Sequence, residues 1–266
     1  MGVNRLGIPI KSMVLISYLT MVIVNVLANV IPINGVTTGQ VSDSYPNLFA
    51  PAGYAFAIWG LIYFLLAGYT LYQLGFFQST RYSLKPSLLG KVGILFAISS
   101  IANAAWIFAW HNYAILVSMI LMIIILVSLI MIVPEINRYE LARKERFFVQ
   151  LPFSVYFGWI TVATIANATT LLVSWGWNGF GISEVVWTVV IIVVGLIISM
   201  ATMIKNSDIA YGLVIIWAYV AILVKHLSPS GFADQYPAII ATVIISLVLL
   251  LVGEGYILFS NRRRLL

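Results

Sequence analysis

The chain has no cysteine and very few charged residues. The absence of cysteine excludes disulfides, thiolate metal sites and cysteine nucleophiles. Charged residues make up 8% of the sequence and hydrophobic residues 62%, whereas a soluble domain carries about 25% charged residues. A soluble fold could not bury so much apolar surface, so we expect lipid to surround most of this protein.

The usual signatures of enzymes are also missing. The sequence contains no phosphate-cradling glycine loop, no serine triad and no pair of carboxylates at catalytic spacing. Its two histidines, His111 and His226, have no acid at a suitable spacing for metal binding, so we expect no metal site. An enzymatic function therefore has little support, and no catalytic residue is assigned.

What the chain does have is eight long apolar runs, each about 20 residues long, which is enough for a helix to cross the hydrocarbon core. Strands of a membrane barrel would instead show shorter segments of alternating polarity. The sequence therefore predicts an all-α membrane protein with eight transmembrane helices. The predicted spans are Ser12–Ile33, Ala52–Leu74, Leu88–Trp110, Tyr113–Val133, Val149–Ser174, Ile182–Ile204, Asp208–His226 and Ala238–Ser260.

The positions of the basic residues fit this count. If the N-terminus is cytoplasmic, Lys225 is the only one of the 14 Lys and Arg residues on the outer side. Such a bias is typical of membrane proteins, so we expect both termini to be cytoplasmic and the plasma membrane to be the location. Topology and anionic lipid account for the net charge of +6, and no nucleic acid partner is needed. We expect the first run to remain as a helix rather than to be cleaved as a signal peptide, because its apolar stretch continues past Val24.

Three of the runs carry stripes of aromatic and amide residues at helical spacing. The residues are Trp59 and Tyr63 in the second run, Asn103 and Trp106 in the third, and Tyr156, Trp159 and Asn167 in the fifth. One interpretation is that they are packing residues and hydrogen bonds between helices. We favour a shared pocket, since an aromatic wall with a few polar groups suits a flat, largely apolar ligand.

These stripes resemble the motifs of the TspO/MBR family, the tryptophan-rich sensory or translocator proteins. Residues 51–63 resemble the family's PPxWxFxxxWxxLY segment, residues 103–106 its LNxxW, and residues 156–167 its PYxxWxxxAxxxLN. The sequence departs from these motifs at Ala50, Tyr54 and Val155, where the family has proline, tryptophan and proline. The resemblance covers roughly residues 10–175.

The resemblance implies a five-helix membrane bundle that often forms dimers and binds porphyrins, sterols or related flat ligands. No cofactor is required, and a bound porphyrin or sterol is the implied ligand. By resemblance, the seven residues of the stripes line or brace the pocket, and residues 34–51 form its lid, with Tyr45, Phe49, Pro51 and the adjoining Tyr54. The implied role is sensing or transport, and porphyrin breakdown stays open.

The last three runs lie outside the motifs. Two of them, the sixth and the eighth, consist almost entirely of Ile, Val and Leu. We therefore predict a five-helix unit over residues 1–177 and a three-helix extension over 178–266. Within the extension, Glu254 is the only acid well inside a span. Either it reaches towards the inner surface, or it serves as the coupling group of a proton-driven transporter for another small apolar solute, which is the alternative function.

Overall fold

The computed structural model describes residues 6–78 and 84–263, so the predicted inner charges Arg5, Arg81 and Arg264 lie outside the described residues. The described ranges contain eight helices long and apolar enough to cross a membrane, and they contain no strand. The predicted all-α membrane fold is therefore confirmed. The long helices are α1 (Ile8–Val30), α3 (Ile58–Leu74), α4 (Pro86–His111), α5 (Ile115–Asn137), α7 (Leu151–Ser174), α8 (Glu184–Asn206), α9 (Ile209–Leu227) and α10 (Pro237–Arg263).

Short helical turns connect some of these spans. Between α1 and α3 lie η1 (Ile33–Gly35), α2 (Thr38–Asp43) and η2 (Gly53–Ala57), and η2 leads directly into α3. The turns α6 (Arg143–Glu145) and η3 (Arg146–Gln150) precede α7, and η4 (Gly179–Gly181) precedes α8. A reciprocal capping box between Thr37 and Gln40 begins α2. The segment predicted as a lid is thus partly helical.

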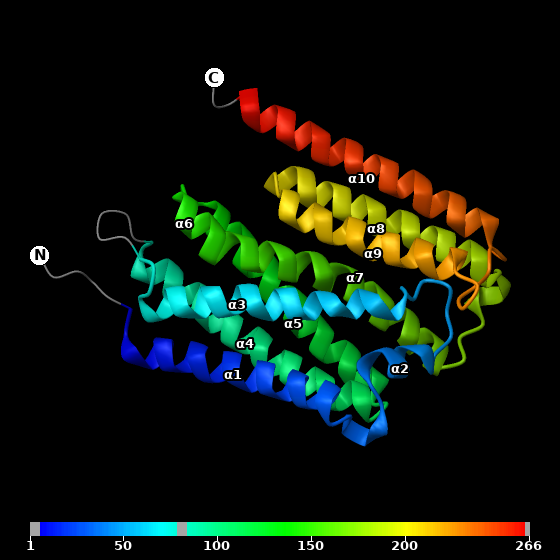
Figure 1. Ribbon diagram of the computed structural model, residues 1–266, viewed down its shortest axis with the longest axis horizontal. Helices are drawn as coiled ribbons and strands as arrows, with labels where there is room; N and C mark the ends of the chain where they lie inside the picture. Colours follow the sequence, from blue (N-terminus) through cyan, green and yellow to red (C-terminus); the bar gives the residue numbers. More distant parts are fainter. Residues whose placement is uncertain (1–5, 79–83, 264–266) are drawn as a thin grey trace, which may run out of the picture.

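The helices form a bundle of α1, α3, α4, α5 and α7, with α8, α9 and α10 alongside it (Figure 1). The two groups meet mainly where α7 packs on α9. Within the second group, α10 packs on both α8 and α9. In the spans of α4 and α7, 67% of the residues in an apolar 18-residue stretch are buried. The corresponding share is 28% in α1 and in α8. The helices that carry the Asn103 and Asn167 motifs are therefore the central ones.

A glycine allows the close contact between α7 and α9. A Cβ atom built on Gly158 would lie 2.9 Å from the backbone oxygen of Tyr211 and 2.9 Å from Cβ of Val214. Small residues at such positions let helix backbones approach closely in membranes. Ala218 and Ala221, further along the same face of α9, are fully buried. The tight α7–α9 seam holds the last three helices against the rest.

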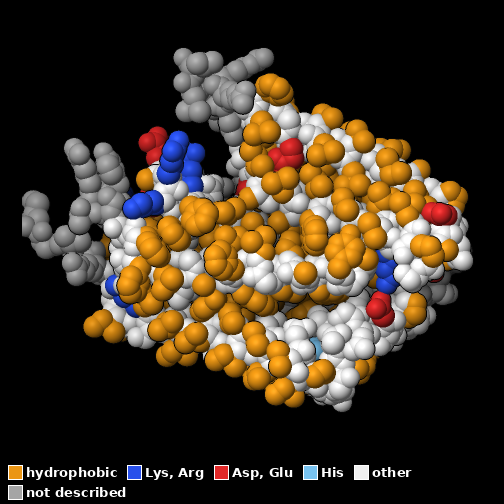
Figure 2. All heavy atoms as spheres, in the orientation of Figure 1, with side chains coloured by type: hydrophobic (Ala, Val, Ile, Leu, Met, Phe, Trp, Pro, Cys, Tyr) orange, Lys and Arg blue, Asp and Glu red, His pale blue; other side chains and the backbone are white. Residues whose placement is uncertain are grey.

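The surface divides into an apolar body and charged ends (Figure 2). At the end where α1 begins, Lys91 and Arg138 both pair with Glu135, at 2.8 and 2.9 Å, and Lys11 donates to the backbone oxygen of Leu74. At the opposite end, Lys225 pairs with Asp43 at 2.7 Å. The apolar body between these ends requires lipid contact, so the protein is an integral membrane protein.

Candidate functional site

Trp59 lies at the centre of the aromatic residues that the sequence predicted. Its ring stacks on Tyr63 one turn further along α3, with centroids 5.4 Å apart. Edge-to-face contacts join Trp59 to Tyr156 at 6.0 Å and to Trp159 at 6.3 Å, both from α7. Phe56 of η2 contacts Trp159 in the same way at 6.0 Å. The α3 and α7 stripes therefore face each other.

Amide side chains brace this cluster from α1 and α4. The side-chain amide of Asn25 donates to Oδ1 of Asn103 at 2.8 Å, and Asn103 donates to the hydroxyl of Tyr156 at 3.4 Å. All three residues are buried. Amides buried in a membrane protein need such partners, so Asn103 and Tyr156 position the cluster.

A second set of hydrogen bonds joins α4, α5 and α7. Nε1 of Trp106 donates to Oδ1 of Asn167 at 2.9 Å, and the amide nitrogen of Asn167 donates to the hydroxyl of Ser118 at 3.1 Å. Trp106 also stacks on Trp110 at 5.2 Å. Ser118 was not predicted, because nothing in its spacing marks it among the apolar residues of α5.

Two hollows adjoin the cluster. A cavity of about 40 Å³ lies inside the protein, and its lining includes Pro51, Phe56, Trp59, Trp106, Trp159 and Asn167. A groove of about 410 Å³ opens sideways between α1 and α3, and its lining includes Asn25, Asn29, Thr38, Phe56, Trp59 and Tyr63. Phe56 and Trp59 line both hollows, so their rings form the wall between them.

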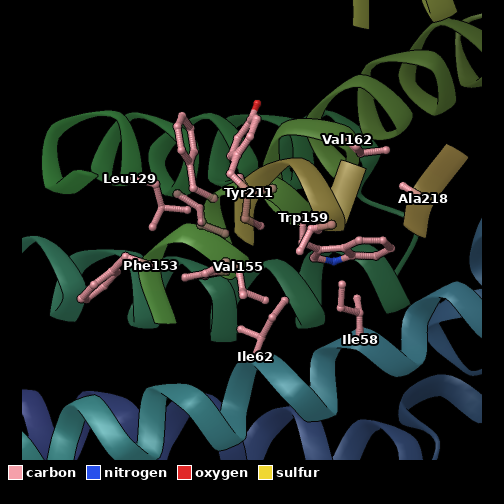
Figure 3. Close-up of a cluster of buried hydrophobic side chains, with 14 of the residues drawn as sticks. Ile58, Ile62, Leu129, Phe153, Val155, Trp159, Val162, Tyr211 and Ala218 are labelled. Atoms are coloured by element: carbon pink, nitrogen blue, oxygen red, sulfur yellow. The ribbon is translucent and has the colours of Figure 1, made fainter. Parts of the chain in front are cut away.

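The predicted pocket residues thus divide into lining and bracing residues. Trp59, Trp106, Trp159 and Asn167 line the inner cavity, Tyr63 lines the groove, and Asn103 and Tyr156 line neither of these two hollows. Figure 3 shows Trp159 between Ile58 of α3 and Ala218 of α9. The residues that line the two hollows all belong to the first five spans and to the segment between α1 and α3.

Two buried donors beside these hollows have no hydrogen-bond partner among the described residues. They are Nε1 of Trp159 and the hydroxyl of Tyr63. A buried polar group without a partner costs about 1–3 kcal/mol, so most such groups in folded proteins are satisfied. Trp159 is one of the residues that line the cavity, and Tyr63 is one of those that line the groove.

The four residues predicted for the lid lie in different surroundings. Pro51 lines the cavity, and Phe49 is 1% exposed and packs in the core. Tyr45 contacts Tyr113, and burial, with a smaller effect of Tyr113, raises the pKa of Tyr45. Tyr54 faces outward, where its ring meets Trp217 of α9 edge-on at 5.4 Å. Tyr54 therefore contacts α9 rather than the cavity.

The lid is attached to α4 on one side. Nε1 of Trp110 donates to the backbone oxygen of Thr38 at 3.1 Å, and a ring nitrogen of His111 lies 3.1 Å from the Thr38 hydroxyl. The side chain of Asn34 donates to the backbone oxygen of His111 at 3.1 Å. The first histidine of the sequence therefore fastens the lid.

The other side of the lid is attached to α8 and α9. A ring nitrogen of His226 lies 2.9 Å from the backbone oxygen of Leu48, and the Leu48 N–H donates to Glu184 at 3.2 Å. The N–H of Ala52 donates to the backbone oxygen of Ala221 at 3.1 Å. Sequence reasoning did not predict these contacts, since they join segments that are more than 130 residues apart.

The remaining candidates lie elsewhere. Glu254 is on α10, where it faces α9 and not the aromatic cluster. Among the residues that the structure describes, no group of three His, Cys, Asp or Glu side chains could hold a metal ion.

Fold and site together define a helical membrane protein with an aromatic-lined cavity and a lateral groove. The family model described as TSPO-like protein matches residues 11–256, so the chain belongs to this family. The match extends through α8, α9 and most of α10, which the motifs in the first five spans did not reach. No curated protein and no solved structure matches the chain significantly. Membership of this family makes the chain a membrane protein of the ligand-binding and sensing type.

Proposed function

We propose that this protein binds a flat, largely apolar ligand with hydrogen-bond acceptors, such as a porphyrin or a sterol, at the aromatic cluster. The observation that carries the proposal is a pair of unpartnered donors, Trp159 Nε1 and Tyr63 OH, on residues that line adjoining hollows. A ligand oxygen or ring nitrogen would accept from them. The surrounding rings would supply apolar contact and stacking.

The volumes suggest how such a ligand would enter. Small-molecule pockets usually measure about 300–1,000 Å³, so the groove of about 410 Å³ is large enough and the cavity of about 40 Å³ is not. The groove opens towards lipid, where an apolar ligand is concentrated. Rotation of the Phe56 and Trp59 side chains would join the two hollows. The ligand would then extend from the groove towards Trp159.

Quenching of tryptophan fluorescence by protoporphyrin, measured on protein in lipid nanodiscs, tests this proposal. We expect Trp59→Leu to weaken binding about fivefold, because an aromatic contact contributes about 1 kcal/mol. The matched control is Trp175→Leu, since Trp175 is 62% exposed and lines neither hollow. Equal affinities of the wild type and both variants, or no quenching at all, would refute the proposal.

A second candidate function is proton-coupled transport of another small apolar solute. The observation that favours it is the burial of Glu254, whose carboxyl has no hydrogen-bond partner in the described structure. Ionisable groups buried in a membrane span are often functional. Uptake of solute into vesicles should then depend on an imposed pH gradient and be lost in Glu254→Gln. Uptake that the substitution leaves unaltered would exclude coupling through this residue.

A further inference from the structure

Glu254 occupies an unusual environment for an acid. It is 6% exposed, and neither carboxyl oxygen has a hydrogen-bond partner among the described residues. A Cβ atom on Gly212 would overlap both Oε1 of Glu254 and the sulfur of Met203. The carboxyl therefore lies in the space that glycine leaves on α9. Its carboxyl is thus directed at the first turn of α9.

A second buried acid lies one turn before Gly212, at the start of α9. Asp208 precedes α9 and is 7% exposed, and its backbone oxygen accepts from the N–H of Gly212. Its carboxylate accepts from the N–H of Tyr211 at 3.1 Å and so caps the helix. Residues four apart lie on one side of a helix. Asp208 and Glu254 therefore approach the same stretch of α9.

No basic side chain neutralises these two acids in the part of the chain that the structure describes. The three ion pairs found there involve neither of them. On α9 the titratable groups near Glu254 are Asp208 and Tyr211, and the buried face of α8 opposite presents Ser199 and Met203, which carry no charge. Two ionised carboxylates would thus share an apolar site without a counter-ion.

Such a pair is costly, because the penalty for burying an unpaired charge amounts to several kcal/mol. The two acids are not equivalent. Burial raises the pKa of Asp208, but hydrogen bonds from the Ser154 hydroxyl and the backbone N–H groups of Tyr211 and Ala210 oppose this effect. These donors stabilise the ionised form of Asp208. Glu254, which has no donor, is left as the group that must be neutral.

We propose that Glu254 is a proton-binding site, built from the carboxyl of α10, the gap at Gly212 and the neighbouring Asp208. Binding adds one proton to a Glu254 carboxylate oxygen, and release returns it to water. The site is the one that the second candidate function, proton-coupled transport, would use, and it does not depend on the aromatic ligand site. Proton binding at Glu254 together with uptake that Glu254→Gln leaves unaltered would refute coupled transport and leave the proton site standing.

The proposed route for this exchange begins in a groove. It lies between α5, α7 and α8, has a volume of about 510 Å³, and includes Thr161, Thr202, Lys205 and Asn206 in its lining. The hydroxyl of Tyr211 donates to Thr161 at 3.2 Å. This bond connects the groove with the face of α9 next to Asp208. Protons would therefore exchange from the basic end of the bundle, where α8 ends at Asn206.

Infrared difference spectroscopy during a pH titration, on the whole chain in nanodiscs, tests the site. We expect the wild type to show the C=O stretch of a protonated carboxyl that disappears as the pH rises. Glu254→Gln should lose this band, with one proton fewer released per chain. Glu140→Gln, a substitution of an exposed acid, should retain it. Glu254→Asp keeps a carboxyl and should show a shifted band, which preserves the test if the Gln variant does not fold.

Two results would overturn the proposal. One is a band that persists unchanged in both Glu254 variants, or no band in the wild type. The other is loss of the band when Na⁺ is added at constant pH, which would assign the site to a metal cation instead. Protoporphyrin binding measured on the same samples keeps the two proposals separate, since we expect Glu254→Gln to leave that affinity unchanged.

Discussion

Removing a single oxygen atom from Tyr63 tests whether the aromatic cluster carries a donor reserved for a ligand. The Tyr63 hydroxyl is buried without a partner, so Tyr63→Phe removes a group that destabilises the ligand-free protein. The gain should be about 1 kcal/mol, the lower end of the penalty for an unsatisfied buried group. In a protein of this size that corresponds to an unfolding temperature about 2–4 °C higher.

Tyr219→Phe is the matched control. Tyr219 is 1% exposed, and its hydroxyl donates to the backbone oxygen of Ile192 at 2.7 Å. Removal of the Tyr219 hydroxyl oxygen breaks this hydrogen bond. The unfolding temperature of Tyr219→Phe should therefore fall by about the 2–4 °C that Tyr63→Phe gains. Thermal unfolding of the ligand-free variants in one detergent gives both values. If Tyr63→Phe is as destabilising as Tyr219→Phe, the Tyr63 hydroxyl has a partner and the reasoning fails.

Ligand should reverse the order of stability. A ligand at 100 times its Kd stabilises the native state by about 2.7 kcal/mol. If its acceptor binds the Tyr63 hydroxyl, Tyr63→Phe should lose about 1 kcal/mol of this effect, which is a roughly fivefold higher Kd. Tyr219→Phe should leave the Kd unchanged. An unaltered Kd in Tyr63→Phe would place the ligand away from this side chain.

Two further predictions concern α9. Burial raises the pKa of the Asp208 carboxyl above 3.8, so this carboxyl holds its proton more tightly in the folded protein than in the unfolded chain. The free energy of unfolding therefore falls as the pH rises from 3.8 through the raised pKa. Asp208→Asn keeps a capping side chain and should remove this contribution, which unfolding measured between about pH 4 and pH 8 would detect as a flatter profile. His226→Phe breaks the contact with the Leu48 oxygen and should speed amide hydrogen exchange in the lid about fivefold, for about 1 kcal/mol. The control for His226→Phe is Lys225→Ala, because the ion pair of Lys225 with the 61% exposed Asp43 contributes little to stability. Equal rates of hydrogen exchange in both variants would contradict a role for His226.

The fold was largely predictable because lipid acts on residues that are continuous in sequence. All eight predicted spans correspond to long helices, and their ends differ by a few residues. The first helix begins at Ile8 rather than at Ser12, since Pro9 lies in its first turn and proline is well suited to that position. Residues beyond an apolar run, such as Asn137 at the end of α5, join a helix without any hydropathy signal.

The site was predictable only as faces of single helices. The spacing of Trp106 and Asn167 indicates that each faces protein, and their hydrogen bond, with Ser118 as a third member, depends on how α4, α5 and α7 pack. The direction of Glu254 depends on a glycine in another helix. Such pairings are set by three-dimensional packing, and one sequence does not contain them.

Helices α8 and α9 hold the lid of a site whose lining residues belong to the first five spans and the segment between α1 and α3. His226 and Ala221 of α9 bind the backbone of residues 48 and 52. Gly212, nearer the start of α9, makes room for Glu254. Helix α9 packs closely on α7 at Gly158 and binds the lid, so a displacement of α9 would change both contacts together. The division at residue 177 stays a prediction from composition, and the contacts of α9 with α7 and with the lid join its two parts.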